Sequence, residues 1–124
     1  MLNALVSPIY DLNAQTISRV VAAGFPGVYL LGHRGAIGLN VRYVGRSDTD
    51  LASRLKDHVS WYSHFQFEYA VGPATAFHEE CRLWHHHGGS QHLNNSIHPD
   101  SPLGMDLKCS VGLCFLLGSL NPNV

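Results

Sequence analysis

Two short runs rich in β-branched and aromatic residues constrain the fold most strongly: "GVYLLG" at 27–32 and "NVRYVG" at 40–45. A glycine-containing connector joins them, which predicts a pair of antiparallel strands. Each run places a tyrosine close to a glycine, Tyr29 in the first run and Tyr43 in the second. Considered singly, the two tyrosines are typical of half-buried aromatic positions in a strand.

The rest of the chain predicts helices around these strands and one further strand. Apolar spacing and capping signals predict helices at about 11–24, 47–59 and 73–87, and the alternating run "HFQFEYAV" predicts a strand at 64–71. This order of elements predicts the α+β class, with a small three-stranded antiparallel sheet flanked by helices. The apolar end, "CSVGLCFLLGSL", fits a strand or a short helix equally well.

Composition restricts the size and location of the protein. The 124 residues suit a single domain over 1–124. No apolar run approaches the roughly 20 residues of a membrane helix, and the opening "MLNALVSPIYDLN" lacks the basic region and long apolar core of a secretory signal. Three cysteines, an odd number, argue against a disulfide framework. We therefore expect a cytoplasmic protein without a membrane segment.

Helix geometry singles out a few ionisable residues. Arg54 and His58 are four residues apart, so their side chains neighbour each other at the border of an apolar stripe. On the helix expected at 73–87, Glu80 lies in the middle of the apolar face, whereas Glu79 points away from it. A carboxylate on an apolar face is costly unless it is paired or binds a metal. The sequence leaves both alternatives open for Glu80.

Taken together, these residues resemble the GIY-YIG nuclease family. The resemblance spans about 27–95 and consists of Gly27-Val28-Tyr29, Tyr43-Val44-Gly45, Arg54 with His58, Glu80, and a following asparagine. In that family the two tripeptides lie on neighbouring strands, the arginine lies on the next helix and the glutamate on a later one. The segment "HLNNSIHP" offers Asn94 and Asn95 for the last element, and Asn95 is preferred because it precedes the Ile-His-Pro that leads the chain away.

The resemblance implies metal-dependent hydrolysis of DNA phosphodiester bonds. It assigns Glu80 to one Mg²⁺ or Mn²⁺ ion, Arg54 to the charge that develops on the phosphoryl oxygens, and Tyr29 to the general base for the attacking water. A tyrosine with its ordinary pKa of about 10 needs nearby positive charge for this role. Tyr43 and His58 would orient water and substrate or share the proton transfer. Four cations would form a local phosphate-binding patch: Arg42, Arg46, Lys56 and Arg82.

A second metal prediction concerns zinc. Cys109 and Cys114, with one or two histidines, predict a structural zinc site that would fasten the tail at 96–124. Cys81 and the histidines at 85–87 are further possible ligands. Cys81 shares a helix face with Phe77 and Trp84, however, where a buried free thiol is the usual state.

Two other functions stay open at this stage. One is a non-catalytic nucleic-acid-binding module on the same scaffold, stabilised by zinc, and the other is a metal-binding or interaction domain unrelated to nucleic acid. The joint presence of Tyr29, Tyr43, Arg54 and Glu80 favours the nuclease, because a binding module needs no such set. The formal net charge of −1 gives no general basic field. We therefore expect target choice to come from loops, a homodimer or a protein partner.

Overall fold

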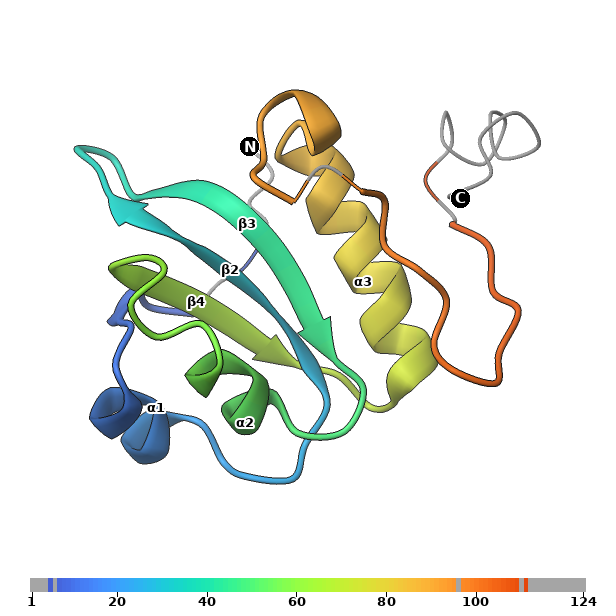
Figure 1. The fold of residues 1–124 in the computed structure, drawn as a ribbon, viewed down its shortest axis with the longest axis horizontal. Helices are drawn as coiled ribbons and strands as arrows, with labels where there is room; N and C mark the ends of the chain where they lie inside the picture. Colours follow the sequence, from blue (N-terminus) through green and yellow to red (C-terminus); the bar gives the residue numbers. More distant parts are fainter. Residues whose placement is uncertain (1–4, 6, 96, 110, 112–124) are drawn as a thin grey trace.

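The computed structural model describes residues 5, 7–95, 97–109 and 111 of the protein. Four antiparallel strands form one sheet in the order β1–β4–β2–β3. The strands are β1 (Tyr10–Asp11), β2 (Gly27–Arg34), β3 (Leu39–Ser47) and β4 (His64–Tyr69). The helices are α1 (Ala14–Val20), α2 (Leu51–Lys56) and α3 (Pro73–His86), followed by a 3₁₀ turn, η1 (Gly89–Gln91) (Figure 1). The predicted α+β class is confirmed.

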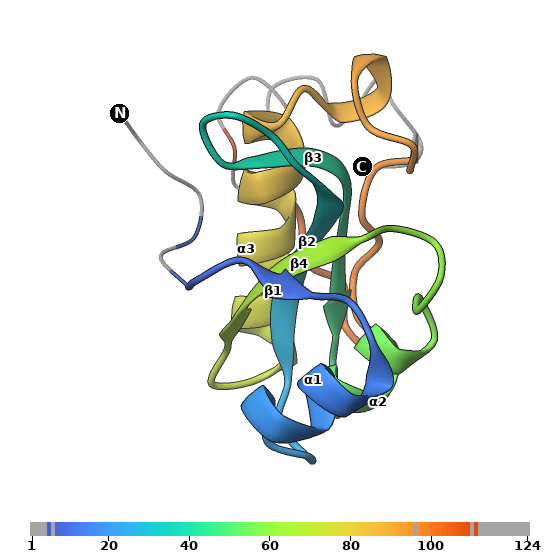
Figure 2. The same ribbon diagram turned by 90° about the vertical axis from the view of Figure 1, so that its left-hand side faces the viewer.

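The prediction of a three-stranded sheet was wrong by one strand. β1 contains two residues, which pair with Phe65 and His64 of β4 (Figure 2). Two residues are too few to show an alternating pattern, so Asp11 was predicted to belong to a helix at about 11–24. That helix is shorter than expected, because it begins after Asn13, whose side chain accepts a hydrogen bond from the backbone N–H of Thr16 at 2.8 Å.

Helices cover both faces of the sheet, with α1 and α2 on one face and α3 on the other (Figure 1). Side chains alternate between the faces along β2. Val28 and Leu30 therefore pack toward α3, whereas Tyr29 and Leu31 pack toward α1 and α2. The first six residues of β2 are buried, which explains the continuous apolar run in this strand. None of the helices among the described residues is long and apolar enough to cross a membrane.

Close packing at the start of β2 requires a glycine at position 27. A Cβ atom there would collide with the carbonyl oxygen of Glu68 on β4, and would lie 2.8 Å from Cδ2 of Leu51 on α2. The backbone of β4 and a side chain of α2 thus occupy the space that a side chain at position 27 would need. The glycine of the Gly-Val-Tyr tripeptide is therefore required for the sheet to pack.

Substitution of this glycine tests the packing. We expect Gly27→Ala to lower the free energy of unfolding by about 1–3 kcal/mol, because the added methyl group overpacks a filled site. Gly72→Ala is the matched control, since a Cβ at Gly72 meets nothing within 4 Å and its φ of −177° is ordinary extended backbone. Urea unfolding of both variants measures the difference. Equal stability of the two variants would contradict this account of Gly27.

Candidate functional site

A cleft of about 450 Å³ runs along β3, between α2 and α3. β3 is the edge strand of the sheet, so its outer side is available to form a wall. Six of the residues predicted from the sequence line this cleft: Tyr29, Tyr43, Arg46, Arg54, Glu80 and Asn95. The remaining walls come from the turn after β3 and from residues 97–100.

Tyr29 and His58 form a buried pair beneath the cleft. Oη of Tyr29 lies 2.8 Å from Nε2 of His58, within hydrogen-bond distance. His58 lies in the turn just after α2, two residues beyond the end of the helix, so it does not share the helix with Arg54 as the sequence predicted. Burial raises the pKa of Tyr29 and lowers the pKa of His58. The pair therefore joins a neutral phenol to a neutral imidazole.

Gly45 provides the space that the ring of Tyr29 occupies. The two residues are direct partners across the β2–β3 ladder. A Cβ at position 45 would collide with Cζ and Oη of Tyr29. The ring of Tyr43 stacks nearby, 6.4 Å from the ring of Tyr29 and tilted by only 11°. The glycine of the Tyr-Val-Gly tripeptide therefore leaves the space that lets the Tyr29 hydroxyl reach the cleft.

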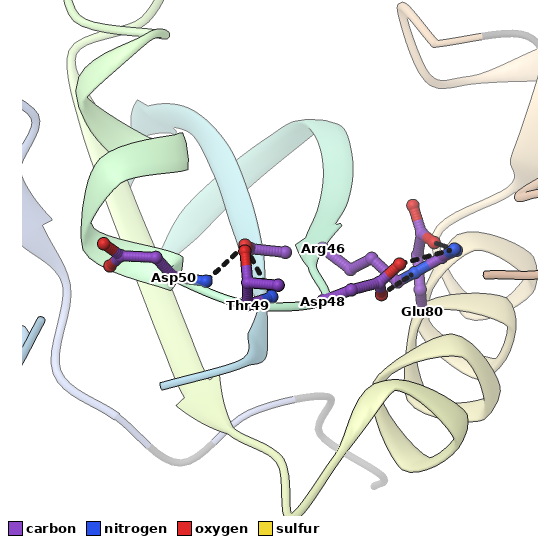
Figure 3. Close-up of polar contacts among 6 residues, drawn as sticks. Arg46, Asp48, Thr49, Asp50 and Glu80 are labelled. Atoms are coloured by element: carbon purple, nitrogen blue, oxygen red, sulfur yellow. Dashed lines mark hydrogen bonds and ion pairs between the residues drawn. The ribbon is translucent and has the colours of Figure 1, made fainter. Parts of the chain in front are cut away.

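Glu80 forms a buried ion pair with Arg46. Oε1 of Glu80 lies 2.6 Å from Nη1 of Arg46, whose Nε donates to Asp48 at 2.7 Å (Figure 3). Glu80 is 8% exposed, and this burial raises its pKa to about 7 even though Arg46 lowers it. The expectation that Glu80 lies on the buried face of its helix is confirmed. Of the two alternatives that the sequence left open, the ion pair is present.

Glu79 has a different environment one residue earlier on α3. It forms an ion pair with Arg82, with Oε1 2.8 Å from Nη2. Neither Glu79 nor Arg82 lines the cleft, so Arg82 does not join Arg46 there. Arg42 and Lys56 are exposed and also do not line the cleft. Of the four cations of the predicted phosphate-binding patch, only Arg46 reaches the cleft.

Arg54 presents a guanidinium group at the mouth of the cleft. Its side chain is exposed, lines the cleft, and makes no hydrogen bond or ion pair with another described residue. Its charge lowers the pKa of Tyr29, although burial outweighs this effect. The donors of Arg54 are therefore available to an anionic ligand.

Asn95 attaches the chain after α3 to the edge strand. Its Oδ1 accepts from the backbone N–H of Val44 at 3.2 Å, and its Nδ2 donates to the carbonyl oxygen of Val44 at 2.5 Å. The indole N–H of Trp84 donates to the Asn95 carbonyl at 2.9 Å. Asn94 points elsewhere and donates to the hydroxyl of Tyr62 at 2.6 Å. Asn95 thus covers an open edge of β3, and its amide is occupied by the backbone.

A second cluster of potential ligands lies beside the cleft. Cys81 of α3, His98 and Cys109 are all buried, and one ligand atom from each lies within 4.8 Å of the others. These three residues could hold a metal ion. Cys109 was part of the predicted zinc site, whereas Cys114 lies outside the described residues. Cys81 was among the possible zinc ligands but was favoured as a buried thiol, and His98 was missed, because no spacing pattern links positions 81, 98 and 109.

Comparison with known proteins identifies no relative of the chain. No protein-family model, curated protein or solved structure matches the chain. The function is therefore inferred from the cleft and its residues.

The raised pKa of Glu80 predicts a pH-dependent contribution to stability. Between its ordinary pKa of 4.5 and about 7, the folded protein keeps a proton that the unfolded chain has lost. The contribution of this carboxyl to the free energy of unfolding should therefore fall across this interval, by on the order of 3 kcal/mol. Half-buried histidines whose pKa is lowered, such as His87, act in the opposite direction, so the comparison with a variant that lacks the carboxyl isolates the effect. Glu80→Gln has no such proton, so the difference in stability should move in favour of this variant as the pH rises.

Urea unfolding at a series of pH values measures this difference. Glu79→Gln is the matched control, because it retains Glu80 and should follow the pH dependence of the wild type. Parallel stability curves for the wild type and Glu80→Gln would show that the buried carboxyl does not titrate in this interval.

Proposed function

We propose that the protein is a metal-dependent endonuclease of the GIY-YIG type, which hydrolyses DNA phosphodiester bonds in the cytoplasm. The observation that carries the proposal is the convergence of Tyr29, Arg54 and Glu80 on one cleft, with His58 hydrogen-bonded to Tyr29. These residues come from β2, α2 and α3, and His58 from the turn after α2. A proton acceptor, a cation and a metal-binding carboxylate are the groups that phosphodiester hydrolysis requires.

The surroundings of Glu80 fit a hard divalent cation. Arg46 holds Oε1, whereas Oε2 accepts no hydrogen bond from another described residue and points away from Arg46 (Figure 3). Mg²⁺ prefers oxygen ligands and keeps several waters, so one protein carboxylate and the substrate phosphate suffice. Glu80 would hold Mg²⁺ or Mn²⁺, which polarises the scissile phosphate and neutralises the leaving oxygen when bound.

Tyr29 and His58 supply the proton acceptor for the attacking water. Burial raises the pKa of Tyr29, so its hydroxyl does not ionise unaided near neutral pH. The 2.8 Å contact with His58 gives the tyrosine proton an acceptor, because the lowered pKa of His58 leaves its imidazole unprotonated near neutral pH. As the water oxygen bonds to phosphorus, its proton passes to Oη of Tyr29 and the tyrosine proton passes to Nε2 of His58. The phosphorus–oxygen bond to the leaving strand then breaks, that oxygen takes up a proton from solvent, and His58 releases the proton it received.

The other residues of the cleft orient the substrate. Arg54 donates to the phosphoryl oxygens as charge develops on them, for which the planar guanidinium geometry is suited. The Tyr43 hydroxyl orients the water or the phosphate. The near-neutral net charge provides little nonspecific attraction to DNA. Target choice is therefore assigned to loops, to a second copy of the chain or to a protein partner.

One observation favours a non-catalytic nucleic-acid-binding module instead. The ion pair with Arg46 already compensates the charge of Glu80 without a metal ion. In such a module the carboxylate would anchor Arg46, and the cleft would bind a phosphate through Arg54. A cleavage assay separates the two functions.

The first test compares the two neighbouring glutamates of α3. With Mg²⁺ or Mn²⁺, the wild type should cleave members of a panel of linear, plasmid and branched DNA. Glu80→Gln should reduce the rate at least about 100-fold, since even second-shell changes at metal sites cost 10–100-fold. Glu79→Gln should leave the rate unchanged, because Glu79 is outside the cleft. DNA binding without metal-dependent cleavage by the wild type would favour the binding module.

The second test compares two exposed cations of α2. Arg54→Ala should lower the cleavage rate at saturating DNA on the order of 10²–10³-fold, the cost of losing a donor to developing negative charge. Lys56→Ala removes a cation from the same helix but outside the cleft, and should leave that rate unchanged. Single-turnover rates measure both. Equal losses of rate in the two variants would show that Arg54 acts only through its general positive charge and makes no specific contact with the substrate.

A further inference from the structure

We propose that Cys81, His98 and Cys109 bind a structural Zn²⁺ ion that fastens residues 97–109 to α3. Cys81 belongs to α3, whereas His98 and Cys109 belong to the segment 97–109, whose first residues line the cleft. Their exposed fractions are 0%, 5% and 1%, so all three donors face the interior. The site is separate from the carboxylate that the proposed nuclease uses.

The donor set suits zinc. Two sulfur atoms and one imidazole nitrogen are soft or borderline ligands, which select zinc over the hard cations that bind carboxylates. Zinc bonds of 2.3 Å to sulfur and 2.0–2.1 Å to nitrogen place tetrahedral ligands about 3.6–3.8 Å apart. The three ligand atoms already lie within 4.8 Å of one another, so a shift of about 1 Å brings them to coordination distance.

His98 is oriented as a metal ligand. Its Nδ1 lies 2.8 Å from the carbonyl oxygen of Pro99. A carbonyl oxygen can only accept, so Nδ1 carries the proton and Nε2 is the unprotonated nitrogen. Histidine ligands commonly donate their second nitrogen to a carbonyl in this way, which fixes the ring and its tautomer. Trp84 packs against the ring edge-on at 5.1 Å and restricts it further.

The surroundings of the two cysteines are apolar. Phe77 forms a buried cluster with Cys81 and Cys109, and Leu107 and Val111 pack against it. An apolar shell excludes water and strengthens metal–thiolate bonds.

Tetrahedral zinc also takes a fourth ligand. Cys114, five residues after Cys109, lies outside the described residues and is not part of the proposed triad.

The position of the triad gives the ion a structural role. His98 belongs to the triad and also lines the cleft, as do its neighbours Ile97, Pro99 and Asp100. Residues 97–109 contain no helix or strand, so backbone ladders do not hold them in place. A zinc ion would instead attach this segment to α3 at two points, His98 and Cys109. The outer wall of the cleft would then depend on the metal.

Elemental analysis of the full chain tests the proposal. The protein should be produced without a polyhistidine tag, under reducing conditions and with zinc in the medium. We expect about one zinc per chain, and near-complete loss of zinc in Cys81→Ser, Cys109→Ser and His98→Ala. His98→Cys should retain zinc, because it preserves a soft ligand while altering the packing. Cobalt-loaded wild type should show thiolate-to-cobalt charge-transfer bands and the ligand-field bands of tetrahedral cobalt.

Two controls distinguish the triad from other cation sites. Glu80→Gln removes the oxygen ligand of the cleft, and His86→Asn removes an exposed histidine from the adjacent run of three. Both should retain the zinc content of the wild type. Wild-type protein without zinc, or with zinc that His86→Asn removes and Cys81→Ser retains, would overturn the proposal. So would a cobalt spectrum without thiolate bands, and this measurement does not depend on any variant folding.

Discussion

The carboxylate of Glu80 lies on the buried face of α3, 2.6 Å from the guanidinium of Arg46 at the end of β3. This contact joins the helix on one face of the sheet to the edge strand, and the cleft forms around it. The compensation is partial, because burial still raises the pKa of Glu80 to about 7. Under the proposed function, a proton and a divalent cation would therefore compete for this carboxylate near neutral pH. Arg46 keeps that carboxylate inside the protein when neither is bound.

The other half of the cleft depends on space rather than charge. Tyr29 lies in the buried part of β2, and its hydroxyl reaches the cleft only because Gly45, its partner on β3, has no side chain. Asn95 then covers the outer edge of β3 at Val44, where an open strand would otherwise expose its backbone groups. The two glycine–tyrosine tripeptides are thus explained by packing alone. Under the proposed function, their role in catalysis comes from the residues beside them, namely His58, Arg54 and Glu80.

Local periodicity accounts for most of what the sequence predicted correctly. The strands around Tyr29 and Tyr43 and the choice of Glu80 over Glu79 depend on repeats of two or about 3.6 residues, which a single chain displays directly. The one wrong strand count and the features that the sequence did not identify have other physical origins. β1 is too short to show a repeat, and the pairing of Arg46 with Glu80 joins positions 34 residues apart. The position of His98 depends on an irregular segment, whose path no periodic pattern determines.

Glu80 and Cys81 are adjacent in sequence, yet a helix turns about 100° per residue and points them in different directions. One residue lines the cleft, and the other faces His98 and Cys109. Under the two proposals, a single turn of α3 offers an oxygen ligand on one side and a sulfur ligand on the other. Hard and soft cations prefer different donors, so each site would select its own metal although the two are close together. Helix geometry alone is enough to keep the two sites apart. His98 belongs to the triad and also lines the cleft, so a zinc ion that fixes His98 would also fix this part of the cleft wall.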